Sequence, residues 1–270
     1  VSGAMSWHTV FTCSRSFIER AATEALARNT WFHAHCNEGT HEGNWARENL
    51  GADTMAFYND IGVASSSFLA SQCVQMTEAE LDIIATSGTR VSHMPLSNCE
   101  VGGGIAPIAD LLERGVTVGL GSDGYVNDMY EVMRGAFWLQ KARRLDPSIT
   151  PAHQVLHMAT EGGAAALGMK NLGRLEPGWI ADLQVVNLDL PTPIDAFTIA
   201  DQLVDLLKKT NPKYLSIWKP KILPSEKARE AIIQKRIEER EGANAAREAN
   251  SLEEENNRKK SERERAIARE

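Results

Sequence analysis

Residues 30–38 read TWFHAHCNE, and this stretch decides how the rest of the chain is interpreted. A short apolar run leads into two histidines and a glutamate, and polar residues with glycines follow at positions 39–43. This pattern is typical of a buried parallel strand whose carboxyl end opens into a functional site. Side chains two residues apart share one face of a strand, so His33 and His35 are expected to point the same way. Because a turn follows the strand, we expect Glu38 to reach the same end of it.

An imidazole with a carboxylate three residues later suits a divalent metal ion and the base that handles its bound water. The alternative is that one histidine is a ligand or contact and the other is packed in the core. For His33 we favour the core interpretation. For His35 we favour the functional one, because residues elsewhere in the chain support it.

Composition bounds the class of protein. The chain has 270 residues, enough for one large α/β domain or two smaller ones. Its formal net charge of −7 argues against a nucleic-acid partner, which would need a basic face. It contains neither an apolar run long enough to cross a bilayer nor a charged-then-apolar leader, so we expect no membrane partner. Because the chain starts at Val1 rather than methionine, we expect a fragment or a processed product.

The cysteines bear on the compartment. None of the four is part of a CxxC pair, which predicts reduced thiols and a cytoplasmic protein. They are Cys13, Cys36, Cys73 and Cys99.

Expected strands and helices alternate from residue 4 to residue 167, with one unit roughly every 25 to 30 residues, as parallel βαβ folding requires. The expected strands are 4–13, 30–36, 66–74, 89–94 and 116–120. The expected helices are 15–28, 45–61, 78–86, 106–114, 128–144 and 151–167. Ser14 is a candidate N-cap, and Thr77 with Glu80 fits a capping box.

Polar residues follow the carboxyl ends of these strands, which is where a (β/α)8 barrel assembles its site. They are His8 with Thr12, His35 with Glu38, Gln72, His93 and Asp123. A doubly wound open sheet is the alternative, and it would usually carry a phosphate loop. Glycines 102–104 precede a helix but lack the GxGxxG spacing, which disfavours the open sheet. We therefore predict an α/β fold that contains part of a TIM-type (β/α)8 barrel, with about five of its β/α units in this chain.

The alternation of expected strands and helices ends after residue 168. We assign residues 1–168 to the barrel portion and 169–198 to a small β appendage, with a strand at 183–188. Residues 199–270 form a charged tail that is helical or disordered, with a helix expected at 201–209. A coiled coil is disfavoured there because sustained apolar heptads are absent.

Asp123 lies between small residues in GLGSDG (119–124), at the end of a buried strand. A buried carboxylate is costly unless it binds a metal, a proton or a partner charge, although a helix N-cap is an alternative role. His93 ends another strand, in SHMPLSN (92–98), and Asn98 lies in the turn-prone segment that follows.

These motifs resemble one family in their order along the chain. Segments TRVSHMPLSN (89–98), GGIAP (103–107) and GLGSDG (119–124) resemble the amidohydrolase superfamily, in particular the aminohydrolases and chlorohydrolases that act on purines, adenosine-like thioethers, guanine, cytosine or triazines. HTVFTCS (8–14) is similar to the fourth barrel strand of that branch, and HCNE (35–38) to the fifth. GRLEPGWIAD (173–182) resembles its return into the β-sandwich, so the resemblance covers residues 5–195.

The resemblance implies a mononuclear metal site that holds Zn²⁺, or alternatively Fe²⁺. His35 and Asp123 would be ligands, Glu38 the proton shuttle, and Asp123 the acceptor of the water proton. His93 would be a catalytic and substrate contact, and three further residues would touch the substrate, namely His8, Gln72 and Asn98. The implied reaction is hydrolytic deamination of a heterocyclic amine, a small-molecule substrate.

Two departures from the family pattern open alternatives. The HxH pair of the family's first strand has no counterpart in this chain, and residues 72–75 read QCVQ where the family carries HCVH. Gln72 can hydrogen-bond a ring or a water molecule, but it is a poor zinc ligand. The alternatives are a catalytically inactive or truncated relative that acts as a binding or assembly module, and a hydrolase that releases halide or an alkylamine. A homo-oligomer also remains open.

Overall fold

The structure is a computed structural model in which residues 3–186 and 194–206 are described. The chain divides into two compact units, Val1–Ile217 and Trp218–Glu270. All described residues belong to the first unit.

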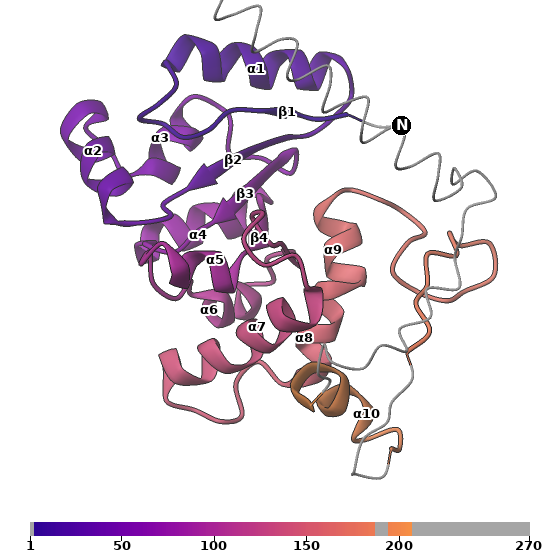
Figure 1. Cartoon of the computed structure of the whole chain (residues 1–270). Coiled ribbons are helices and arrows are strands. Elements are labelled where there is room, and N and C mark those ends of the chain that lie inside the picture. The colour runs from indigo at the N-terminus through magenta and orange to yellow at the C-terminus, as the bar shows by residue number, and fades with distance from the viewer. Residues whose placement is uncertain (1–2, 187–193, 207–270) are drawn as a thin grey trace, which may run out of the picture. The chain divides into compact units, whose positions relative to one another are not determined.

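Five parallel strands form one sheet in the order β1-β2-β3-β4-β5, and successive strands are therefore neighbours (Figure 1). The strands are β1 (Met5–Ser6), β2 (Phe32–Cys36), β3 (Phe68–Gln72), β4 (Arg90–His93) and β5 (Val118–Leu120). Parallel neighbours need crossover connections, and helices provide them here. The predicted α/β class and the five predicted strands are confirmed, although each strand is shorter than expected.

The connecting helices account for most of the remaining described residues. They are α1 (Arg15–Ala27), α2 (Thr40–Leu50), α3 (Thr54–Asp60), α4 (Glu78–Ser87), α5 (Pro95–Glu100), α6 (Ile108–Glu113), α7 (Met129–Arg144), α8 (Ala152–Ala159), α9 (Glu161–Ala166), α10 (Ile199–Asp201) and the π-helical turn η1 (Gln202–Leu206). Ser14 caps α1 by accepting a hydrogen bond from the Phe17 amide at 3.3 Å. Thr77 and Glu80 form the predicted capping box at α4.

Residues 4–13 do not form one strand. Backbone pairing to β2 continues as far as the bond from the His35 amide to the His8 carbonyl, 3.0 Å long. Beyond it, the Thr12 hydroxyl accepts from the Thr9 amide at 3.2 Å and lies 3.0 Å from Nδ1 of His8. These local side-chain bonds turn the chain away from the sheet.

Two expected helices are each divided in two. Gly51 ends α2 with a left-handed φ of 71°, and α3 starts after Asp53, so the expected helix 45–61 is wrong. Thr160, with φ −119° and ψ −93°, separates α8 from α9 within the expected helix 151–167. Helix α5 was not predicted at all.

The segment after α9 also differs from expectation. Within the described part of the expected strand 183–188, only an isolated bridge at Val185 is present. Helix 201–209 is replaced as far as residue 206 by the end of α10 and by η1. The rest of both segments and the charged tail from residue 207 lie outside the described residues, so the predicted domain boundaries stay predictions.

The two faces of the sheet have different characters. Phe32, Ala34 and Cys36 of β2 are fully buried and belong to the hydrophobic core, where the rings of Trp7, Phe32 and Phe68 stack with centroids 5.6 to 5.7 Å apart. The opposite face carries His33 and His35, both half-buried, as predicted from the alternation. His33 therefore lies beside His35 rather than in the core as we expected.

All four cysteines carry free thiols. In the part of the chain that the structure describes, no helix is both long and apolar enough to cross a membrane. The cytoplasmic location stays a prediction.

Candidate functional site

The carboxylate of Asp123, just after β5, is the point where three strand ends meet. Its Oδ1 lies 3.7 Å from Nε2 of His35, which comes from β2. Its Oδ2 accepts a hydrogen bond from the side-chain Nε2 of Gln72, at the end of β3, at 2.9 Å, and another from the hydroxyl of Ser97, in α5, at 2.6 Å. His35 and Asp123 thus converge at the carboxyl end of the sheet, as the sequence predicted.

The backbone at this point is unusual in two places. Gln72 pairs with Cys36, whose side chain faces the core, so the Gln72 side chain would be expected to face the core as well. Its Nε2 nevertheless donates to Asp123 on the other face. Gln72 has φ 71° and Asp123 has φ 53°, and this left-handed conformation turns each residue out of its strand. Gly121 is equally constrained, since a Cβ there would lie 2.8 Å from Oγ of Ser92. Gly121 therefore permits a close approach of β4 to the segment that follows β5.

Two further histidines surround His35. The ring of His8 lies 5.1 Å from that of His35 between centroids, and the ring of His33 lies 5.9 Å away. Burial lowers the pKa of His33, with His35 acting in the same direction and Asp123 opposing it. The cluster therefore favours a neutral imidazole at His33.

His93 and Asn98 are buried residues that do not belong to the row of side chains around His35. The pairing of β3, β4 and β5 puts Ser92 in the same row as His35, so the side chain of His93 points to the opposite face. His93 is 1% exposed, and burial lowers the pKa of its imidazole to about 3. Asn98 is fully buried, and its carbonyl accepts from the amides of Gly103 and Gly104. The catalytic and substrate-binding roles of both side chains stay predictions.

Ser97 was not assigned a role from the sequence. It is presented by the short helix α5, which begins at Pro95, a residue favoured in a first helical turn. The apolar periodicity of a six-residue helix is too short to be recognised, so only the folded chain reveals that Ser97 binds Asp123.

Glu38 lies in the turn between β2 and α2, and a second glutamate, Glu42 of α2, binds the backbone of this turn. Oε2 of Glu42 accepts a hydrogen bond from the Asn37 amide at 2.7 Å. Burial raises the pKa of Glu42 to about 8, and the amides of Asn37 and Glu38 oppose this shift. Glu42 is 2% exposed.

This buried carboxyl predicts a pH dependence of stability. The native pKa lies above the ordinary value of 4.5, so the folded protein holds a proton that the unfolded chain has lost between pH 4.5 and about 8. The free energy of unfolding should therefore fall as pH rises through this range, by up to about 1.4 kcal/mol per pH unit. Glu42→Gln cannot titrate and should lose this slope in urea unfolding, whereas Glu48→Gln, at an exposed position of α2, should keep it. An unchanged slope in Glu42→Gln would contradict the assignment.

The pair formed by His35 and Asp123 is compatible with a shared ion. Two donors bound to one zinc ion at about 2.0–2.2 Å lie about 3.3 Å apart in tetrahedral geometry. The observed 3.7 Å between Nε2 and Oδ1 requires only a small adjustment. Within residues 3–186 and 194–206, however, no group of three or more His, Cys, Asp or Glu side chains is arranged to hold a metal ion. The spacing of the pair fits two positions of a coordination sphere, and metal binding by His35 and Asp123 stays a prediction.

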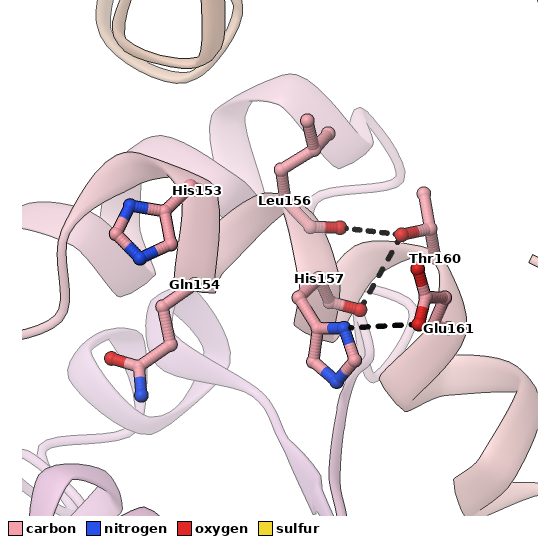
Figure 2. A pocket seen from close by; sticks show the side chains of 6 residues that line it. All are labelled: His153, Gln154, Leu156, His157, Thr160 and Glu161. Carbon is pink, nitrogen blue, oxygen red and sulfur yellow. Dashed lines mark hydrogen bonds and ion pairs between the residues drawn. The ribbon is translucent and has the colours of Figure 1, made fainter. Parts of the chain in front are cut away.

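The described part of the chain also contains several hollows. One, of about 710 Å³, borders the row of His35 through Ser92 and Gly119 and is lined further by residues of α7 and α9. Another, of about 440 Å³, lies on α8 and α9 and contains none of the predicted site residues (Figure 2). In the second one, Nδ1 of His157 approaches Oε2 of Glu161 at 3.5 Å, and Arg174 pairs with the same oxygen at 2.6 Å.

The comparison with protein families gives a match to the amidohydrolase family over residues 1–219. The chain belongs to this family. The match confirms the resemblance that the motifs predicted.

Curated relatives within the family carry deaminase names. A 5-methylthioadenosine/S-adenosylhomocysteine deaminase from Pelotomaculum thermopropionicum is 35% identical over 188 residues, which are 68% of this chain and 43% of the relative. A 5'-deoxyadenosine deaminase from Methanothermobacter thermautotrophicus is 34% identical over 192 residues, which are 70% of this chain and 45% of the relative. The chain thus spans less than half the length of these relatives.

Solved structures of the family have the same fold. An adenosine deaminase from Xanthomonas campestris with bound zinc superposes with a TM-score of 0.72 at 30% identity, covering 76% of this chain and 48% of that one. The atrazine chlorohydrolase from Arthrobacter aurescens, complexed with zinc, gives a TM-score of 0.68 at 25% identity, covering 74% and 45%. Together with the parallel sheet, these neighbours confirm the predicted partial TIM-type barrel.

Proposed function

We propose that this chain carries part of the active site of a metal-dependent hydrolase that deaminates a heterocyclic amine of the adenosine type. The observation that supports this most directly is the approach of His35 and Asp123 at 3.7 Å, with Glu38 in the turn after the same strand. Membership of the amidohydrolase family and the names of the deaminase relatives support the reaction class.

His35 and Asp123 are the residues that would hold the ion, for which we propose Zn²⁺ with Fe²⁺ as the alternative. The zinc in two related structures supports this choice. Once bound, the ion would supply Lewis acidity and lower the pKa of a water molecule. Two protein donors are fewer than the three that catalytic zinc sites use, so further donors have to come from outside the described residues.

The protein side chains divide the proton transfers between them. Asp123 accepts a proton from the water molecule as the water oxygen attacks the amine-bearing ring carbon, and this proton passes to Glu38, which delivers it to the ring nitrogen. The second proton of the water molecule is released as the carbonyl forms, and Glu38 transfers it to the departing amine. Water and the amine are consumed, a carbonyl and ammonia are formed, and no oxidant or reductant is needed.

Substrate contacts are proposed for four side chains around this pair. The ring of His8 lies beside that of His35, and the side chain of Gln72 contacts Asp123. Contacts from His93 and Asn98 would require their buried polar atoms to face the ligand. A homo-oligomer stays a prediction. A halide leaving group is supported by the chlorohydrolase among the solved neighbours, and an alkylamine leaving group stays a prediction.

A second candidate is a catalytically silent relative that binds a ligand or a partner. The observation that favours it is Gln72, whose amide occupies Oδ2 of Asp123 together with Ser97. Glutamine is a neutral side chain, which cannot replace an imidazole as a strong zinc ligand.

The experiment that separates the candidates measures metal content and ammonia release together. The 270-residue chain is reconstituted with Zn²⁺ or Fe²⁺, alone and mixed with the portion of the Pelotomaculum relative that it does not match. The substrates are adenosine, 5'-deoxyadenosine and 5-methylthioadenosine. Stoichiometric metal and ammonia release support the hydrolase. A protein that binds neither ion and releases no ammonia in both forms overturns the hydrolase and favours the silent relative.

A further inference from the structure

We propose that Glu42 and Glu80 hold Asn37 as a fixed bridge between β2 and β3 and thereby set the position of Glu38, the proton-transfer residue of the proposed function, on which this inference rests. Both glutamates are positioning residues, because they act on Glu38 through Asn37 and the turn rather than on the substrate.

Asn37 is bonded through its amide, its carbonyl and its side chain. Its amide donates to Oε2 of Glu42 at 2.7 Å, and its Nδ2 donates to Oε1 of Glu80 at 2.8 Å. Its carbonyl accepts from the amides of Val74 and Gln75, at 3.0 and 2.9 Å. Its φ of 50° is one that asparagine adopts more readily than most residues, so the bridge forms without a glycine. Asn37 therefore joins the ends of the strands that carry His35 and Gln72.

Glu42 holds the turn from the side of α2. It lies in the first turn of that helix, where free backbone amides can donate hydrogen bonds to its carboxyl oxygens. The Glu38 amide also lowers the pKa of Glu42, so it lies near the same carboxyl group. One carboxyl group thus binds the Asn37 amide and faces the next peptide group, which leads into the proposed proton shuttle.

Glu80 is itself held in place by other bonds. Its Oε2 accepts from the Thr77 amide and its Oε1 from the Met55 amide, both at 3.0 Å. It is 1% exposed, so its bonds do not compete with bulk water. The Asn37 side chain is therefore anchored to the starts of both α3 and α4.

The glycine loop before α6 confines the turn from the other side. A Cβ on Gly103 would come within 2.2 Å of the Glu38 carbonyl oxygen, so only glycine fits there. Nε2 of Gln75 donates to the Gly103 carbonyl at 2.6 Å. With fixed contacts on both sides, the Glu38 backbone has little room to move. Such precision matters for proton transfer, because a shift of about 1 Å can cost about 100-fold in rate.

The test compares three variants with a matched control on α2. Asn37→Gly keeps the left-handed backbone and removes the side-chain bonds to Glu80 and to the sulfur of Met76. Glu42→Ala removes the acceptor, Glu42→Gln keeps one acceptor oxygen, and Glu48→Gln changes an exposed residue of the same helix. Amide hydrogen exchange at residues 37 and 38 is measured together with kcat and KM for ammonia release.

We expect exchange of these two amides to accelerate at least about tenfold in Glu42→Ala, and much less in Glu42→Gln. In an active protein, kcat should fall about 100-fold in Asn37→Gly and Glu42→Ala with KM nearly unchanged, and Glu42→Gln should recover most of it. Glu48→Gln should match the wild type in every measurement.

Two results overturn the inference. The bridge would be contradicted if amides 37 and 38 exchanged as slowly in Glu42→Ala as in the wild type. It would also be contradicted if kcat in Asn37→Gly equalled kcat in Glu48→Gln. If Glu42→Ala does not fold, Asn37→Gly and Glu42→Gln decide. A wild type that binds no metal ion and releases no ammonia, both alone and mixed with the missing portion of the relative, would refute the proposed function, and hydrogen exchange would then decide the bridge by itself.

Discussion

Replacement of Glu38 by glutamine is expected to lower kcat for ammonia release by about 100- to 10,000-fold, the usual contribution of a general acid–base group. Glutamine has nearly the same shape but can neither take up nor deliver the protons that the ring nitrogen and the leaving amine require. Metal content should be unchanged because Glu38 is not a proposed ligand. The hydrogen bond from the Asn37 amide to Glu42 should survive, since its donor is a backbone group of the preceding residue.

Steady-state kinetics and metal analysis on the same preparation check this result. Glu48→Gln serves as the control, since it removes an equal charge from an exposed position nearby. A Glu38→Gln protein that keeps more than half of the wild-type kcat would rule out the proton-shuttle role. If the protein is instead a silent relative, the substitution should leave its biological function intact.

Replacement of Asp123 by asparagine is expected to weaken metal binding by at least about 100-fold, the upper range seen for loss of a ligand's supporting residue, and to abolish ammonia release. Asparagine tolerates the φ of 53° at this position, so the backbone should be retained. Its amide oxygen can still accept from Gln72 and Ser97, as Oδ2 does now. The substitution therefore removes the negative charge beside His35 and little else.

Isothermal titration calorimetry with Zn²⁺ measures the loss of metal affinity. Hydrogen exchange on the same protein checks that it is folded. Asp60→Asn is the matched control, because Asp60 is exposed at the end of α3. Zinc affinity equal to that of the wild type in Asp123→Asn would show that Asp123 is not a ligand. The pairing of His35 with Asp123 would then be an ordinary ion pair.

Local sequence rules predicted the elements whose signals are short-range. The Ser14 cap, the Thr77–Glu80 capping box and the period of two in β2 depend on neighbours a few residues away, and each is present in the structure. The same rules failed where the backbone changes direction through side-chain bonds, as at Thr12, or through a break at Thr160. Periodicity continues across such a break, so it cannot reveal one.

The sequence by itself determined the succession of parallel strands, the class of fold and the strand ends at which His35 and Asp123 lie, because period and capping are local properties of the chain. Only the tertiary structure decided that Gln72 and Ser97 converge on Asp123, that His93 faces away from His35, and that Asn37 joins Glu42 to Glu80. These contacts join residues that are 5 to 51 positions apart. They depend on strand register and on left-handed turns, which fix where a side chain points only after the sheet has assembled.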